Sequence, residues 1–132
     1  MSQKQNENGF DRIIEIELNA AAVLVGVLFW VMLSVFSGYE NAWDDPVYWD
    51  FGFPGMLVTA FCFGWSAPER PIRRGIWMGL GHGLGALFCG LIHGYGFNLW
   101  PHMAGIGVVF AVLLGLSAAV GGFFVRRRRA IK

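Results

Sequence analysis

The chain has 132 residues, of which 55% are hydrophobic and only 14% are charged, and its formal net charge is +1. Charged residues make up about a quarter of an ordinary soluble domain, so this composition excludes that class and favours a helical membrane protein. The length allows one domain, and four membrane spans of roughly 20 residues each would occupy most of it.

The basic residues are placed unevenly along the chain. All ten fall into three clusters, and the stretches around residues 38–53 and 95–102 contain none. Because Lys and Arg gather in cytoplasmic loops, this pattern predicts four crossings with both termini in the cytoplasm. On that topology, ten basic and five acidic residues give the inside +5, and four acidic residues give the outside −4. The clusters are Lys4 with Arg12, Arg70 with Arg73 and Arg74, and Arg126 to Arg129 with Lys132.

The first apolar run predicts a span over residues 13–37, after a polar N-terminal segment at 1–12 that we expect to be loose. The run is too long for the apolar part of a signal peptide. Near its start, Glu15 can pair with Arg12 one helical turn earlier. We expect Glu17 to meet an arginine of the second or third cluster at the cytoplasmic surface.

The next segment contains two prolines that bear on the second span. Asp45 followed by Pro46 is typical of an N-cap and a first helical residue, so a helix can start there. Pro54 then either begins the second span, at 54–67, or bends a helix that began at Pro46. The stretch 54–67 is short for a crossing, which favours the bent or re-entrant alternative.

Two further spans are predicted at 76–94 and 102–125, followed by a basic cytoplasmic tail at 126–132. Tryptophans mark the expected membrane boundaries, as is typical of an aromatic belt, and only Trp30 lies well inside a span. The boundary tryptophans are Trp43, Trp49 and Trp100 outside, and Trp65 and Trp77 inside.

Together these elements predict an all-α membrane protein, a bundle of four antiparallel transmembrane helices over residues 13–125. A short internal similarity accompanies them. The segments that begin at Gly38 and at Gly94 share the order Gly-Tyr, Asn, Trp, Pro. A duplicated two-helix hairpin would produce this similarity, and so would chance.

Glycines dominate the third span and predict close helix packing, because small residues let two backbones approach in lipid. One interpretation is that this span is the central packing helix of the monomer. The other, on which our leading functional hypothesis depends, is that it docks a second copy or a membrane-complex partner. The helix-packing candidates are Gly75, Gly79, Gly83, Gly90 and Gly94.

The histidines are the main candidates for chemistry. His82 is deep in the third span, and ionisable residues there are costly and often functional, so it could line the path of a small oligomeric channel or carrier. His93 and His102 are weaker candidates for a metal or redox site on the outer side. We interpret Cys62 and Cys89 as small apolar fillers, and we expect no cofactor.

The chain contains no nucleophile elbow, phosphate-binding loop or metalloprotease pair, and we predict no catalytic residues. A nucleic-acid partner is also not expected, because the last basic cluster stands beside a helix that ends at the membrane. That cluster, Arg126, Arg127, Arg128 and Arg129, would instead attract anionic lipid headgroups at roughly 1 kcal/mol per residue. Our leading hypothesis is therefore a non-catalytic interaction or accessory subunit.

One stretch resembles small four-span bacterial membrane proteins of unassigned function. In that group an aromatic pair and a Gly-x-Pro precede a span that ends in a proline-rich basic turn. The chain departs from the group in the third span, where His82 and a denser run of glycines stand in place of the expected polar residue. The resemblance implies a bacterial inner-membrane location and no particular activity. The matching residues are Tyr48, Trp49, Gly52, Pro54, Pro68, Glu69, Arg70 and Pro71.

Overall fold

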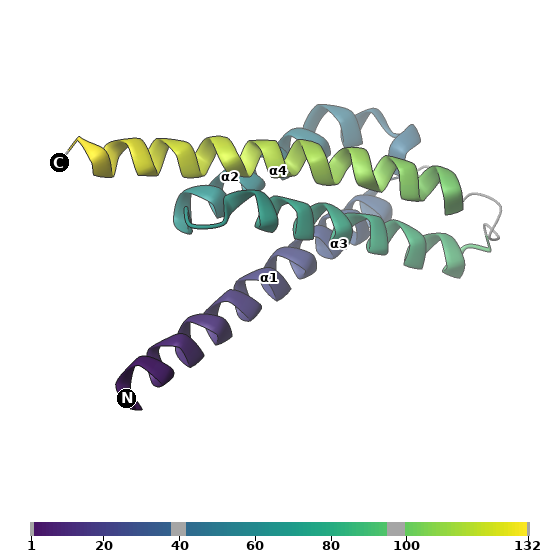
Figure 1. Ribbon diagram of the computed structural model, residues 1–132. Helices are drawn as coiled ribbons and strands as arrows, with labels where there is room; N and C mark the ends of the chain where they lie inside the picture. Colours follow the sequence, from purple (N-terminus) through teal and green to yellow (C-terminus); the bar gives the residue numbers. More distant parts are fainter. Residues whose placement is uncertain (1, 38–41, 95–99, 132) are drawn as a thin grey trace.

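The computed structural model describes the backbone of residues 2–37, 42–94 and 100–131, and the side chains of 13–37, 42–94 and 104–131. No strand occurs within these ranges, which confirms the all-α prediction. A 3-10 helix, η1, and a π-helix, η2, lie between α1 and α2 (Figure 1). The elements are α1 (Ser2–Phe36), η1 (Ala42–Asp44), η2 (Tyr48–Gly52), α2 (Phe53–Ser66), α3 (Pro71–Ile92) and α4 (Trp100–Ala130).

Three helices are long and apolar enough to cross a membrane: Ile13–Phe36 within α1, Pro71–Ile92, and Ala104–Ala130 within α4. Two expectations about helix ends were wrong. The N-terminal segment is helical from Ser2, and α4 continues through the arginines to Ala130 instead of ending before a tail. At the C-terminal end the reason is that arginine is a good helix former, so charge limits the apolar stretch without ending the helix.

The helix that leads into α2 starts where the sequence predicted. The Asp45 side chain caps it by accepting a hydrogen bond from the Val47 amide at 2.9 Å, and Pro46 is the first helical residue. Val47, Gly52 and Phe53 all have right-handed helical backbone angles, so the helical path runs unbroken from Pro46 through η2 into α2. Pro54 therefore lies inside a helix that began at Pro46.

Helix α3 is central, with α1 on one side and α4 on the other. Gly81 lies against Val23 and Gly85 against Val27, so residue numbers rise together along α1 and α3. The two helices therefore run in the same direction. In Figure 1 the N-terminal half of α1 diverges from the other helices.

Helix α4 runs opposite to α3 and in the same direction as α2. Gly75 lies against Leu114 and Gly79 against Ala111, so numbers fall along α4 as they rise along α3. On the other side of α4, the Ser117 hydroxyl donates to the Leu57 carbonyl at 2.8 Å, and Gly121 lies against Phe61. Successive helices thus alternate in direction.

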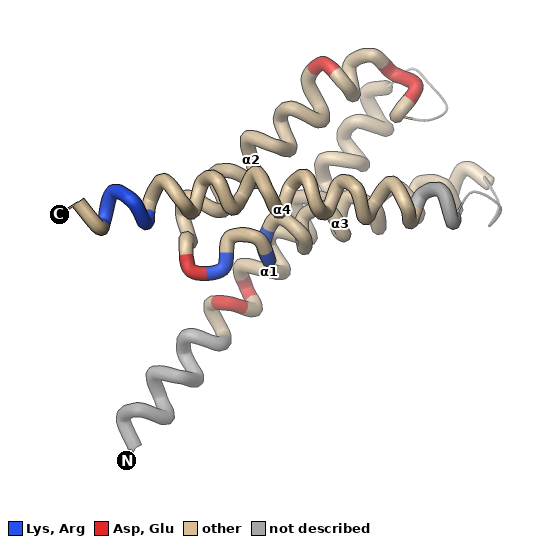
Figure 2. The backbone as a smooth tube through the Cα atoms, turned by 45° about the horizontal axis from the view of Figure 1, so that its top comes forward, with Lys and Arg blue, Asp and Glu red and all other residues tan. Residues whose placement is uncertain are grey.

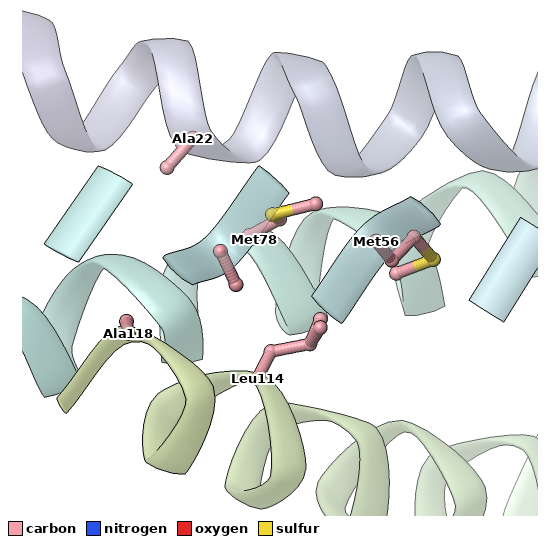
Figure 3. Close-up of a cluster of buried hydrophobic side chains, with 6 residues drawn as sticks. Ala22, Met56, Met78, Leu114 and Ala118 are labelled. Carbon is pink, nitrogen blue, oxygen red and sulfur yellow. The ribbon is translucent and has the colours of Figure 1, made fainter. Parts of the chain in front are cut away.

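Small residues make the close contacts between helices. A Cβ atom at Gly26 or Gly81 would collide with backbone atoms across the α1–α3 contact, and one at Gly64 or Gly121 would do so between α2 and α4. The larger side chains fill the space that remains around these contacts. Figure 3 shows Met56, Met78 and Leu114 between the helices, together with Ala22 and Ala118.

The predicted packing glycines have different surroundings. Gly75 and Gly79 lie in the α3–α4 contact and Gly90 is also buried. Gly83 is half-buried, and a Cβ there would meet only the Cα of Gly107, at 3.8 Å. Gly94 was placed wrongly, because it follows the end of α3 and is exposed. Its φ of +76° suits the glycine that commonly ends a helix.

Charged residues gather toward the two ends of the bundle (Figure 2). At one end, Glu15 accepts hydrogen bonds from both Arg70 and Arg73, each at 2.6 Å, which ties α1 to the start of α3. The sequence predicted Arg12 as the partner of Glu15, and the Arg12 side chain lies outside the described residues. It offered Arg73, Arg74 or a C-terminal arginine to Glu17. Near the opposite end lie the acidic residues Asp44, Asp45 and Asp50.

Gly79→Ala should destabilise the protein by about 1–3 kcal/mol, because the new Cβ would lie 2.7 Å from the Ala111 nitrogen in a contact that cannot expand freely. Gly83→Ala is the matched control on the same helix. Its Cβ would make only an ordinary van der Waals contact with Gly107, so the change should be neutral or stabilising, since alanine favours helix over glycine by about 1 kcal/mol. Unfolding in mild detergent measures both, and equal effects would contradict this packing.

Candidate functional site

His82 lies near the middle of α3 and is fully buried, with 0% of its surface exposed. The glycine beside it, Gly81, allows α1 to approach so closely that the backbone of Gly26 lies against the His82 backbone nitrogen. The backbone of α1 therefore occupies the space beside the small neighbours of His82.

The imidazole is paired with a tyrosine that is 34 positions earlier in the chain. Tyr48 Oη lies 2.9 Å from His82 Nε2, and both residues are buried. One of the two groups donates, the phenol O–H or the Nε2–H, according to the histidine tautomer. The other ring nitrogen, Nδ1, faces the backbone of Gly26 without a hydrogen bond of normal geometry.

Aromatic rings from three other elements enclose the pair. The centroid of the His82 ring is 5.0 Å from that of Trp30 in α1, 5.4 Å from Phe110 in α4 and 6.2 Å from Trp43 in η1. Each such ring contact is worth about 0.5–1.5 kcal/mol beyond the area it buries. The Nε1–H of Trp30 is buried among these rings without a hydrogen-bond partner. We call Trp30, Trp43, Tyr48, His82 and Phe110 the aromatic cluster.

A π-helical turn positions Tyr48. The Phe53 amide donates to the Tyr48 carbonyl, five residues back instead of four, so the turn holds one residue more than an α-helix would. Turns of this kind are rare and occur frequently at functional sites. Here the turn directs the Tyr48 ring inward, and the exposed Trp49 ring beside it donates its Nε1–H to the Trp43 carbonyl at 2.8 Å.

The sequence pointed to His82 but not to the residues around it. Trp43 was expected at the membrane boundary, and Tyr48 was named only among the residues that carry the resemblance. One signal was present, since Trp30 was the only tryptophan well inside a predicted span. A ring with a polar N–H at that depth indicates an aromatic or polar partner nearby.

The other chemical candidates do not come together in the described part of the chain. His93 is exposed at the end of α3, where its Nδ1 lies 2.8 Å from the Cys89 carbonyl oxygen, and the side chain of His102 is outside the described residues. Within those residues, no three His, Cys, Asp or Glu side chains are grouped to hold a metal ion. Cys62 and Cys89 are not joined in a disulfide.

No family model, curated protein or solved structure matches this chain. The function of the protein therefore has to be inferred from the geometry of the aromatic cluster. An imidazole bonded to a phenol can hold a proton or bind a small polar solute. In this conformation the surrounding rings separate both groups from solvent.

Tyr48→Phe should lower the free energy of unfolding by about 1–2 kcal/mol, because it leaves the buried Nε2 of His82 without a partner. The double variant Tyr48→Phe, His82→Leu should lose less than the sum of the two single variants, since neither polar group then remains unpaired. Phe51→Leu, at an exposed position of the same turn, is the control. Strictly additive losses in detergent unfolding would show that the pair contributes nothing.

Proposed function

We propose that the protein is a four-span integral membrane protein of the bacterial inner membrane, with both termini in the cytoplasm. The three long apolar helices and their alternating directions support this topology. The fourth span is the helical run from Pro46 to Ser66, which at 1.5 Å per residue is about 30 Å long, near the thickness of the hydrocarbon core. The gathering of arginines at one end of the bundle supports the orientation.

Within the membrane, we infer a non-catalytic accessory or interaction subunit. The observation that carries this proposal is that His82, the titratable group deepest in α3, is engaged in holding elements together. It is bonded to Tyr48 and enclosed by rings from three other elements. A group used in this way is part of the packing and has no open face for a substrate.

The partner surface that we propose is not the glycine face of α3, as the sequence suggested. Helix α4 already occupies the positions of Gly75 and Gly79 and helix α1 those of Gly81 and Gly85, so these glycines support the packing of the chain itself. A second copy or a membrane partner would instead meet one of the outer aliphatic faces. On α1 that face comprises Leu24, Leu28, Met32 and Val35, and on α4 it includes Val108, Val112, Leu116 and Val120, all of which are exposed.

Anionic lipid headgroups are the other proposed partners. Residues Arg126–Arg129 extend α4 by one exposed turn, and the Arg128 guanidinium lies 5.1 Å from the centre of the Trp65 ring. This cation–π contact places a charge beside an aromatic ring of the kind found at headgroup level. Lipid phosphates could reach all four guanidinium groups there.

A small carrier or channel is the second candidate, with His82 on its path. The observation that favours it is the combination of a π-helical turn and a buried polar pair between α3 and the segment before α2. No described geometry favours the third hypothesis, a metal or redox subunit.

Reporter fusions test the topology. Green fluorescent protein fused after Lys132 should fluoresce, and alkaline phosphatase fused there should be inactive, because phosphatase requires the disulfides that form outside the cytoplasm. Phosphatase fused after Asp44 of a truncated chain should be active. An active phosphatase after Lys132 would reverse the orientation.

Extraction into lipid nanodiscs followed by mass measurement tests the interaction role. We expect the particle to contain a second copy or a partner. Leu28→Trp or Val112→Trp should remove it while leaving monomer stability unchanged, because lipid accommodates a larger apolar ring and a packed interface does not. A lone monomer in all samples would end this proposal. Solute flux in reconstituted vesicles that falls in His82→Ala would favour the carrier.

A further inference from the structure

Several side chains of the segment Ala42–Gly52 reach in between α1, α3 and α4, while the outer face of the segment is exposed. Ala42 and Tyr48 are buried, and the Trp43 ring lies 4.6 Å from that of Trp30 and 5.8 Å from that of Phe110. The segment covers His82 on the side where α1 ends and α2 begins. We call it the plug.

The plug is tied to itself by two hydrogen bonds. The Asp45 carboxylate accepts from the Val47 amide, and the Trp49 indole donates to the Trp43 carbonyl. The second bond joins residues six positions apart, so the stretch from Trp43 to Trp49 can move as one unit. A third bond, between Tyr48 and His82, joins it to α3.

The π turn gives the plug a second position. In the observed conformation, the Phe53 amide donates to the Tyr48 carbonyl. If it donated to the Trp49 carbonyl instead, the turn would become α-helical and residue 48 would rotate by about 100° around the helix axis. That rotation would remove the Tyr48 hydroxyl from His82.

Pro54 lowers the barrier between these two registers. The next donor in the chain would be the amide of residue 54, and proline has none. In either register residue 54 donates no backbone hydrogen bond, so the change of register does not have to break one there. A helix with a donor at position 54 would have one more bond to exchange.

We propose that the plug is a conformational device with two registers. In the latched register Tyr48 is hydrogen-bonded to His82. In the released register this bond is broken and the aromatic cluster is open to solvent. Release would turn the closed pair into an accessible polar site. The inference rests on the membrane embedding proposed above, but not on which side the termini face.

Thiol labelling in nanodiscs tests this device, because both membrane faces are then open to the reagent. In a Cys62→Ala, Cys89→Ala background, one reporter is Ala86→Cys, which is buried beside the aromatic cluster. The control reporter is Ala60→Cys, buried in the other core cluster, which also contains Met56 and Met78. Tyr48→Phe should speed labelling at the first reporter roughly threefold to tenfold, as expected for the loss of one hydrogen bond, and leave the second unchanged.

Deletion of Phe51 tests the register change itself. It removes one exposed residue from the π turn, so the bond from Phe53 to Tyr48 becomes an ordinary α-helical one and the second register disappears. In the Tyr48→Phe background, this deletion should return labelling of Ala86→Cys to the slow rate.

Three results would overturn the proposal. Equal acceleration at both reporters would show that Tyr48 holds the whole bundle and not the plug alone. An unchanged rate at Ala86→Cys in Tyr48→Phe would show that the hydroxyl is no latch. Fast labelling that persists after deletion of Phe51, with Ala60→Cys still slow, would show that the plug does not move by a change of register.

Discussion

Close backbone contact between α3 and its two neighbours is the constraint on which the rest of the structure depends. In a bilayer, lipid tails compete equally for apolar side chains, so helices associate through dispersion contacts and hydrogen bonds. Glycine allows such contacts by removing the side chain. Gly81 against Val23 and Gly79 against Ala111 bring three backbones together, and α2 joins α4 in the same manner at Gly64 and Gly121.

That close approach also explains the position of the buried His82. A helix held tightly on both sides has little space for an imidazole, and His82 points instead into the region enclosed by Trp30, Trp43 and Phe110. A polar ring in such a place needs a hydrogen-bond partner, which Tyr48 supplies. The glycine contacts and the aromatic cluster are therefore two parts of one packing arrangement.

Electrostatics organises the ends of the bundle, where packing is weaker. Glu15 joins α1 to Arg70 and Arg73, and Arg128 lies against Trp65 on α2. Surface ion pairs of this kind contribute little to stability. Their charges have a larger effect on which side of a membrane each helix end can occupy, because arginine is retained on the cytoplasmic side.

The sequence by itself determined the all-helical class, the apolar lengths of α1, α3 and α4, the cap at Asp45 and the importance of glycine in α3. Each of these properties depends only on the residues of its own segment and not on the segments that pack against it. Composition could not place the helix ends at Ser2 and Ala130, because charge and helix propensity act independently. Only the tertiary structure decided which helices use the glycines and that Tyr48 meets His82. Those contacts join residues far apart in the chain. The contact of Tyr48 also depends on a π turn that no local sequence pattern predicts.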